Sequence, residues 1–197
     1  MARATLTTYQ KKRRFDETPE PRGGRRSPKR AGARFVVQLH RSSHLHFDFR
    51  LEIDGVFKSW AVPKGPSLNP SDKRLAMHVE DHPLEYGDFE GQIPAGNYGA
   101  GEVIVWDRGT YEMLDDESPS EAYRRGALKF RLRGEKLRGG FALVKMKRRD
   151  SDQDAWLLIK EHDDEVDRRW RASAHPESVL TGRTLDDIAR EAGGKVR

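Results

Sequence analysis

The chain has 197 residues, with 37 Lys and Arg against 32 Asp and Glu, a net charge of +5, 35% hydrophobic residues and no cysteine. The length fits one domain with some additional chain. The missing cysteines exclude a disulfide scaffold, a thiolate nucleophile and a zinc site built on sulfur. The longest uninterrupted apolar run, at 155–159, is far below the roughly 20 residues of a membrane helix. The first residues contain no apolar signal region, so we expect a cytoplasmic protein.

The positive charge is concentrated at the start of the chain. Residues 1–34 hold 11 Lys and Arg and 3 Asp and Glu, a net of +8, while the remaining 163 residues carry a net of -3. The segment contains Pro, Gly and Arg without apolar periodicity, so it cannot fold alone. We expect a basic N-terminal arm over 1–34, either loose or laid across the domain, that can contact phosphates.

From Phe35 onward, short apolar segments alternate with Gly, Pro, Asn and Asp, which is typical of a β-rich domain. Strands are predicted at 35–40, 45–53, 56–62, 74–80, 102–106, 127–132, 141–147 and 155–160. Asp54-Gly55 predicts a two-residue hairpin turn, because both turn positions need a positive φ. The sequence therefore predicts a mainly β domain over 35–192, a curved antiparallel β-barrel with small peripheral helices, followed by a tail at 193–197.

Two of those helices have recognisable start signals. Ser118 is followed by Pro119 and Glu121, a capping box with proline at the first helical position, and Gly126 ends the segment. A second helix is predicted to begin near Thr184 and to end at Gly193. Its expected apolar face consists of Leu185, Ile188, Ala189 and Ala192.

The predicted strand 45–53 alternates strictly between apolar and ionisable residues. Its ionisable face consists of His46, Asp48, Arg50 and Glu52. An ordinary strand with a solvated outer face is one explanation. However, five of the seven histidines lie between positions 40 and 82, and His46 and Asp48 are close enough to ligate one metal ion. Alternation favours His44 as a third ligand, and His40 at the end of the preceding strand is the alternative.

Further side chains of the types that phosphate chemistry uses follow downstream. They are Lys64, Arg74, Glu80, His82 and Tyr86. Each alone is better explained as a surface charge or a structural residue, but together with the His/Asp strand they favour a phosphate site. The glycine-rich stretch 91–101 lacks the Gly-Lys-Ser/Thr ending of a nucleotide loop, so a tight structural loop is predicted there.

Several long motifs resemble one known family. These are FVVQLH, LHFDFRLEIDGVFKSWAVPKGPS, RLAMHVEDHPLEYGDFEGQIPAGNYGAGEVIVWDRGTYE, LRGEKLRGGFALVKM and AWLLIKEHD, together with residues 9–21. In this order they look like the 3'-phosphoesterase module of bacterial DNA ligase D and its free-standing bacterial and archaeal relatives. The resemblance covers most of the chain.

The resemblance implies an enzyme of DNA end repair, in non-homologous end joining, that depends on manganese or another divalent transition metal. A phosphodiesterase step removes a 3'-terminal ribonucleoside from a primer-template end, and a phosphomonoesterase step converts the resulting 3'-phosphate to a ligatable 3'-hydroxyl. It also implies work on the nucleoid of a prokaryotic cell. Ligase, polymerase and end-binding proteins would act in trans.

The resemblance also assigns roles to individual residues. It implies His40, His46 and Asp48 as metal ligands. It implies Arg50, Arg74, Glu80 and His82 as catalytic groups, with the arginines neutralising phosphate oxygens and His82, oriented by Glu80, protonating the leaving oxygen or bracing the phosphorus centre. It implies Lys64, Tyr86, Arg13 and Glu20 as substrate-binding groups. The chain departs from the family pattern at Arg14, where an acidic residue is expected, although Asp16 lies two residues later.

Two other function classes fit part of the pattern. His46 and Asp48 with a later histidine such as His82 imitate the two-histidine, one-carboxylate triad of non-haem iron oxygenases. That triad explains neither the surrounding arginines nor the basic arm. Alternatively, a β-barrel with a basic arm could bind nucleic-acid ends without any catalysis.

Overall fold

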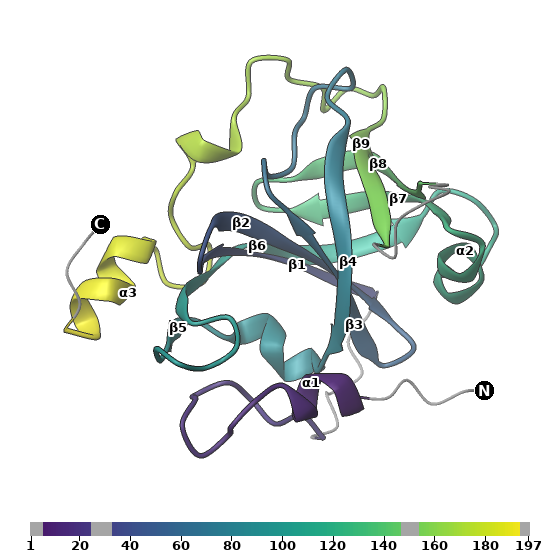
Figure 1. The fold of residues 1–197 in the computed structure, drawn as a ribbon. Helices are drawn as coiled ribbons and strands as arrows, with labels where there is room; N and C mark the ends of the chain where they lie inside the picture. The colour runs from purple at the N-terminus through teal and green to yellow at the C-terminus, as the bar shows by residue number, and fades with distance from the viewer. Residues whose placement is uncertain (1–5, 25–32, 147–153, 194–197) are drawn as a thin grey trace.

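The computed structural model describes residues 6–24, 33–146 and 154–193. Within them, eight antiparallel strands close into a barrel in the order β1-β2-β3-β4-β9-β8-β7-β6, with β6 pairing back onto β1 (Figure 1). The strands are β1 (Ala33–Arg41), β2 (Leu45–Ile53), β3 (Val56–Val62), β4 (Arg74–His82), β6 (Gly101–Met113), β7 (Ala127–Gly134), β8 (Arg138–Lys145) and β9 (Ala155–Lys160). The predicted mainly β barrel is confirmed.

The hairpin between β2 and β3 forms at the predicted turn. Asp54 and Gly55 have φ values of 54° and 80°, as a type I' turn requires. This turn fixes the register, so that Arg50 lies opposite Ser59 and Asp48 opposite Ala61. The apolar face of β2 points into the barrel, where Phe47, Phe49, Leu51 and Ile53 are buried with the aromatic core. Leu45, at the start of the strand, is exposed.

The region from 91 to 113 differs from the sequence prediction. A short strand, β5 (Gly91–Ile93), extends the sheet beyond β6, and β6 continues to Met113, well past the predicted end at 106. Asp107 and Gly109 are of types common in turns, but here both serve tertiary contacts. Asp107 is fully buried and accepts backbone N–H groups of the β7–β8 turn. A Cβ on Gly109 would lie 2.1 Å from the Arg133 carbonyl oxygen.

Both predicted helices are present. α2 (Pro119–Arg125) begins with the capping box at Ser118 and ends at Gly126 in the left-handed conformation. α3 (Leu185–Glu191) is capped by Thr184 and buries Leu185, Ile188 and Ala189. The helix ends at Glu191, one residue before Ala192, which is exposed, so its assignment to the apolar face is wrong. Three short elements were not predicted: α1 (Thr7–Lys11), η1 (Leu84–Asp88) and η2 (Ala172–Ala174).

The N-terminal segment, residues 6–24, covers part of the outer face of the barrel. In Figure 1 the purple segment that contains α1 lies at the bottom of the view, with the teal turn η1 and the lower end of β4. Tyr9 from this segment packs in a buried cluster with Tyr86, Phe89, Ile93 and Val103. On the ionisable face of β2, Asp48 and Arg50 are buried and His46 and Glu52 are half-buried, so this is not the solvated strand face of the simpler explanation.

Parts of the predicted arm and tail, 1–5, 25–32 and 194–197, lie outside the described residues.

In the part of the chain that the structure describes, no helix has the length and apolar character needed to cross a membrane.

A half-buried histidine joins α2 to the barrel and makes stability depend on pH. His78 Nε2 lies 2.8 Å from the Tyr123 hydroxyl, and Nδ1 lies 3.2 Å from an oxygen of Asp154. Burial lowers the pKa of His78, and the nearby carboxylates of Asp154 and Asp81 only partly oppose this. The folded state therefore binds fewer protons than the unfolded state, in which histidine has a pKa of about 6.5.

We expect the free energy of unfolding to fall as the pH drops from about 7 to about 5. In this range His78 takes up a proton in the unfolded state but not in the folded state, where its pKa is lowered. The variant His78→Gln should show a shallower decline in urea titrations over this range. A residual slope should remain, because the pKa of buried His82 is also lowered. The control His44→Gln, at an exposed position, should keep the full slope. An unchanged slope in His78→Gln would contradict the assignment.

Candidate active site

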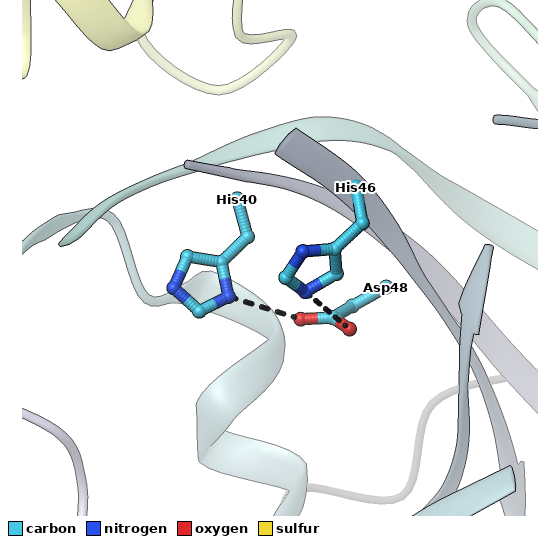
Figure 2. Close-up of side chains that lie close together, drawn as sticks. All are labelled: His40, His46 and Asp48. Atoms are coloured by element: carbon cyan, nitrogen blue, oxygen red, sulfur yellow. Dashed lines mark ion pairs between the residues drawn. The ribbon is translucent and has the colours of Figure 1, made fainter. Parts of the chain in front are cut away.

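Three side chains converge on the outer face of β1 and β2 (Figure 2). His40 lies directly opposite His46 across the two strands, and Asp48 follows two residues later on the same face. His40 Nδ1 lies 3.6 Å from one Asp48 oxygen, and His46 Nε2 lies 3.4 Å from the other. One ligand atom from each residue lies within 4.8 Å of the others. Two imidazoles and a carboxylate at this spacing form a group that could hold a metal ion.

The second nitrogen of each histidine is held by a backbone carbonyl. His40 Nε2 lies 2.8 Å from the Gly99 oxygen, and His46 Nδ1 lies 2.9 Å from the His44 oxygen. An imidazole that donates to a carbonyl keeps its other nitrogen as an acceptor facing Asp48, which is the usual support of a metal-binding histidine. His44, which alternation favoured as the third ligand, is exposed and contributes this carbonyl instead. The bend at 42–44 breaks the alternation between β1 and β2.

Arg50 is the central cation of the site. It is 1% exposed and donates to the Asp48 carboxylate (3.0 Å), the Gln38 side-chain oxygen (2.8 Å) and the Ser59 hydroxyl (2.9 Å). Its guanidinium also lies over the Tyr86 ring, 4.9 Å from the centroid. Burial alone would raise the pKa of the Asp48 carboxyl, but Arg50 and the two histidines outweigh it and hold this pKa well below its usual range. Asp48 is therefore a charged carboxylate held in one orientation.

A bulge in β4 brings Glu80 and His82 to this face. Ser59 pairs with Val79, but Phe57 pairs with His82, so two residues of β4 oppose a single residue of β3. Before the bulge, His78 contacts Trp60, Trp156 and Tyr123 on the other side of the strand. After it, the even-numbered Glu80 and His82 line the same pocket as Asp48. Such a change of face is a common effect of bulges near active sites.

The N-terminal segment supplies an arginine and a carboxylate to the same place. Arg13 donates to Glu20 (2.8 Å) and to Glu80 (3.2 Å), and its Nη2 lies 3.2 Å from His82 Nε2. Glu20 is buried and also accepts the Tyr86 hydroxyl at 3.0 Å. The pKa of Tyr86 is raised well above its ordinary value by burial and by the Glu20 charge. Arg13, Glu20 and Tyr86 thus form one hydrogen-bonded network around His82.

The protonation of His82 follows from its neighbours. A guanidinium can only donate, so His82 Nε2 accepts from Arg13 and Nδ1–H donates to the Glu80 carbonyl oxygen at 2.8 Å. Burial, together with the charges of Arg50 and Arg13, lowers the pKa of His82 well below its ordinary value. In this arrangement His82 is a neutral acceptor at the pocket.

Two of the residues assigned by the resemblance lie elsewhere. Lys64 is exposed in the turn after β3, and Arg74 donates to Asp72 at 2.9 Å at the start of β4. Neither is among the described residues that line the pocket. Arg74 lies three residues before Met77 on β4, a separation of about 10 Å along the strand, and Lys64 lies two residues past the end of β3. Arg74 and His78 both precede the bulge, and alternation places them on the same side of β4. Glu80 and His82 follow Val79 and lie on the pocket side.

The pocket has a volume of about 480 Å³ and is bounded by the barrel face, the N-terminal segment and the loop 94–100. Its lining combines ionisable groups with small and apolar residues. The ionisable residues are Arg13, His40, His46, Asp48, Arg50, Glu80 and His82, and the loop contributes Tyr98, Gly99 and Ala100. This volume lies within the range of small-molecule sites, roughly 300–1,000 Å³.

Several contributors were missed in the sequence. Gln38 is fully buried and orients Arg50 while donating to the carbonyl oxygens of Tyr86 and Phe89. Ser59 lies opposite Arg50. Alternation along β1 would have placed Gln38 on the same face as His40. The hairpin register set by the Asp54-Gly55 turn would have placed Ser59 opposite Arg50. Tyr9 has no comparable signal, because its burial depends on where the N-terminal segment packs.

The three-residue group fits a divalent transition metal. Two imidazole nitrogens and one carboxylate suit borderline cations such as manganese, iron or zinc, and three protein ligands leave positions open for substrate oxygen or water. The oxygenase-like arrangement with His82 as the distal histidine does not form, because His82 is bound to Arg13 and the Glu80 backbone. His40 completes the group instead.

Comparisons with known proteins identify the family of the chain. The family described as DNA Ligase D 3'-phosphoesterase domain matches residues 38–145. The multifunctional non-homologous end joining protein LigD of Pseudomonas aeruginosa is 52% identical over 91% of this chain. The corresponding DNA repair protein LigD of Mycobacterium tuberculosis is 45% identical over 77%, and LigD of Mycolicibacterium smegmatis is 44% identical over 72%. The matches cover only 22%, 19% and 19% of these relatives. The chain belongs to the family of DNA ligase D 3'-phosphoesterase domains.

Proposed function

We propose that the protein is a metal-dependent hydrolase that heals DNA 3' ends during non-homologous end joining. It removes a 3'-terminal ribonucleoside and then the resulting 3'-phosphate, which leaves a 3'-hydroxyl. The observation that carries the proposal is the His40–His46–Asp48 group beside two buried guanidinium groups, Arg13 and Arg50, in one pocket. A divalent cation and fixed positive charge together stabilise the negative charge that develops on phosphate oxygens during hydrolysis. Manganese is the proposed cofactor.

His40, His46 and Asp48 would hold the divalent cation, and the chemistry it would supply is polarisation of a phosphoryl oxygen and activation of water. The chain's own residues would position the phosphate and balance the charges of the site. Arg50 holds Asp48 in its charged form and adds a positive field at the pocket. Arg13 projects two of its N–H groups toward Glu80 and His82 at the pocket wall, where a non-bridging phosphate oxygen can replace one of these acceptors.

His82, Glu80 and Tyr86 are proposed to set the geometry around the phosphate. With a proton on Nδ1, His82 presents Nε2 as an acceptor, which suits orienting a water or a hydroxyl of the substrate better than protonating a leaving oxygen. Glu80 fixes Arg13 and accepts from Lys12. Glu20 accepts from both Arg13 and the Tyr86 hydroxyl and so also holds Arg13. Lys64 and Arg74 are proposed to contact phosphates of the strand farther from the reacting end.

Binding of a terminal phosphate is expected to depend on the divalent cation. With the histidines neutral, the charges of Arg13, Arg50 and Lys12 are cancelled by those of Asp48, Glu20 and Glu80. A bound dication makes the site net positive. A primer with a non-hydrolysable 3'-phosphonate should bind roughly 10- to 150-fold more tightly than its 3'-hydroxyl counterpart in manganese, because charged hydrogen bonds contribute about 1.5–3 kcal/mol.

This preference should disappear in EDTA. The measurement is fluorescence anisotropy of 5'-labelled primer-templates at constant ionic strength, because backbone contacts vary with salt. An equal preference with and without the cation would show that the arginines alone select the phosphate.

The function is tested with a labelled primer-template that ends in a ribonucleotide. Incubation with manganese should give first a 3'-phosphate and then a 3'-hydroxyl product, and EDTA should abolish both. Asp48→Asn should remove activity, while Asp88→Asn, at a side chain 61% exposed, should retain it. Salt-sensitive DNA binding without any product would favour the end-binding barrel instead. Iron-dependent oxygen uptake would favour the oxygenase.

We propose that the ligase and polymerase activities of end joining act on the healed 3'-hydroxyl, with end-binding proteins holding the DNA. Reconstitution with a separate ligase tests this, since sealing of a ribonucleotide-ended nick should require the protein.

A further inference from the structure

A half-exposed aromatic ring stands at the rim of the pocket. Tyr98 is 50% exposed and lines the pocket together with the candidate metal ligands. Among the described residues it is one of five exposed large hydrophobic side chains, and the other four do not line the pocket. The proposed hydrolysis does not use this ring.

The loop that carries Tyr98 is fixed to the site. The next residue, Gly99, has a φ of 73°, and its carbonyl oxygen lies 2.8 Å from His40 Nε2. Arg14, from the N-terminal segment, donates to the Gly96 oxygen at 3.2 Å. Turn hydrogen bonds from Asn97 to Pro94 and from Ala100 to Asn97 close the loop. The position of Tyr98 is therefore set relative to the histidine that would hold the cation.

Two cations lie close to the Tyr98 ring. Lys12 Nζ lies 4.5 Å from its centroid and 3.3 Å from its hydroxyl oxygen, and the Arg13 guanidinium lies 5.6 Å from the centroid. Lys12 is in turn paired with Glu80 at 3.1 Å. Cation–π contacts orient an aromatic ring while leaving part of its surface open. An oriented aromatic ring beside positive charge is the arrangement on which proteins stack nucleic-acid bases.

We propose that Tyr98 is the stacking platform for the base of the 3'-terminal nucleoside. This inference rests on the proposed function, since it places the terminal phosphoester against the ionisable residues that line the pocket and the attached nucleoside against the loop 94–100. Every base has a π-face, so stacking accepts any terminal base. A base can stack here only after leaving its pair, so unpaired or mismatched 3' ends bind better than paired ones.

The test uses a primer-template whose 3'-terminal ribonucleoside is joined through a non-hydrolysable phosphonate, with a 5' fluorophore and manganese present. A second probe carries an abasic ribose at the same place. Wild-type protein should bind the base-containing probe about 5- to 150-fold more tightly, the range that corresponds to base–aromatic stacking. Tyr98→Ala should bind both probes equally, and Tyr98→Phe should keep the preference.

A 3'-terminal 2-aminopurine gives a second readout, because its fluorescence should be quenched by wild type and Tyr98→Phe but not by Tyr98→Ala. Retention of the preference by Tyr98→Ala would overturn the proposal. Equal loss in Tyr98→Phe and Tyr98→Ala would overturn it as well, by assigning the effect to the hydroxyl contact with Lys12. Because binding is measured without turnover, a protein that stacks the base but hydrolyses nothing would refute the proposed function and leave the stacking site standing.

Discussion

Replacing Arg50 by methionine is expected to lower the free energy of unfolding by about 3–5 kcal/mol, the usual result of removing one partner from a buried charge pair. The Asp48 carboxylate would stay buried without its strongest partner, and Gln38 and Ser59 would each lose a donor. The same change should abolish 3'-end processing, because Asp48 would no longer be held toward the two histidines. Arg50→Lys should recover little, since an ammonium cannot reproduce the three planar contacts.

Chemical denaturation of the metal-free protein, at one pH, measures the stability change, and product analysis on the ribonucleotide-ended primer measures activity. The matched control is Arg133→Met, at a side chain 64% exposed and paired with Glu112, which should change stability by no more than about 0.5 kcal/mol. In the double variant Arg50→Met with Asp48→Asn, the free energy of unfolding should fall by less than the sum of the decreases in the two single variants. The reason is that no buried carboxylate remains unpaired. Full activity in Arg50→Met would contradict this account of the site.

Replacing Tyr9 by alanine is expected to undock the N-terminal segment and leave the barrel folded. The Tyr9 ring is fully buried and contacts His82, Tyr86 and Phe15. The Arg13 guanidinium lies 3.9 Å from its centroid. Removing a buried aromatic ring costs about 3–5 kcal/mol, more than a short segment with few other buried side chains can offset. Activity should fall with the loss of Arg13 from the pocket.

Hydrogen exchange and limited proteolysis should show residues 6–24 becoming accessible in Tyr9→Ala, while near-ultraviolet circular dichroism of the tryptophan core stays unchanged. Tyr9→Phe is the control, because it keeps the ring and loses only the hydroxyl donation to the Pro21 oxygen at 2.6 Å. That loss is worth about 1 kcal/mol. Wild-type activity and protection in Tyr9→Ala would show that Arg13 reaches the pocket without this anchor.

Much of this site can be predicted from motif resemblance and strand alternation together. The pair His46 and Asp48 on one strand face follows from a period of two, which is a local property of a β-strand. Hairpin register is equally accessible, because a two-residue turn at Asp54-Gly55 fixes every cross-strand pair between β2 and β3. Strand alternation cannot decide between His40 and His44 as the third ligand, because the bend at 42–44 interrupts the period of two. Only the family resemblance favours His40.

By itself, the sequence determined the β-rich class, most strand positions, both capped helices and the chemical type of the site, because alternation, turn residues and capping boxes act over a few neighbouring residues. Only the tertiary structure decided which face of β4 His82 occupies, since a bulge shifts the alternation after Val79. It also decided that Asp48 and Arg50 on the ionisable face of β2 are buried, because the covering layer comes from residues 6–24 and from η1. The basic arm illustrates the difference. Its +8 charge suggested general phosphate contact, whereas the fold places Arg13 beside His82 and Glu80 within the pocket. Contacts between segments so distant in the chain depend on barrel closure and packing, which no local pattern encodes.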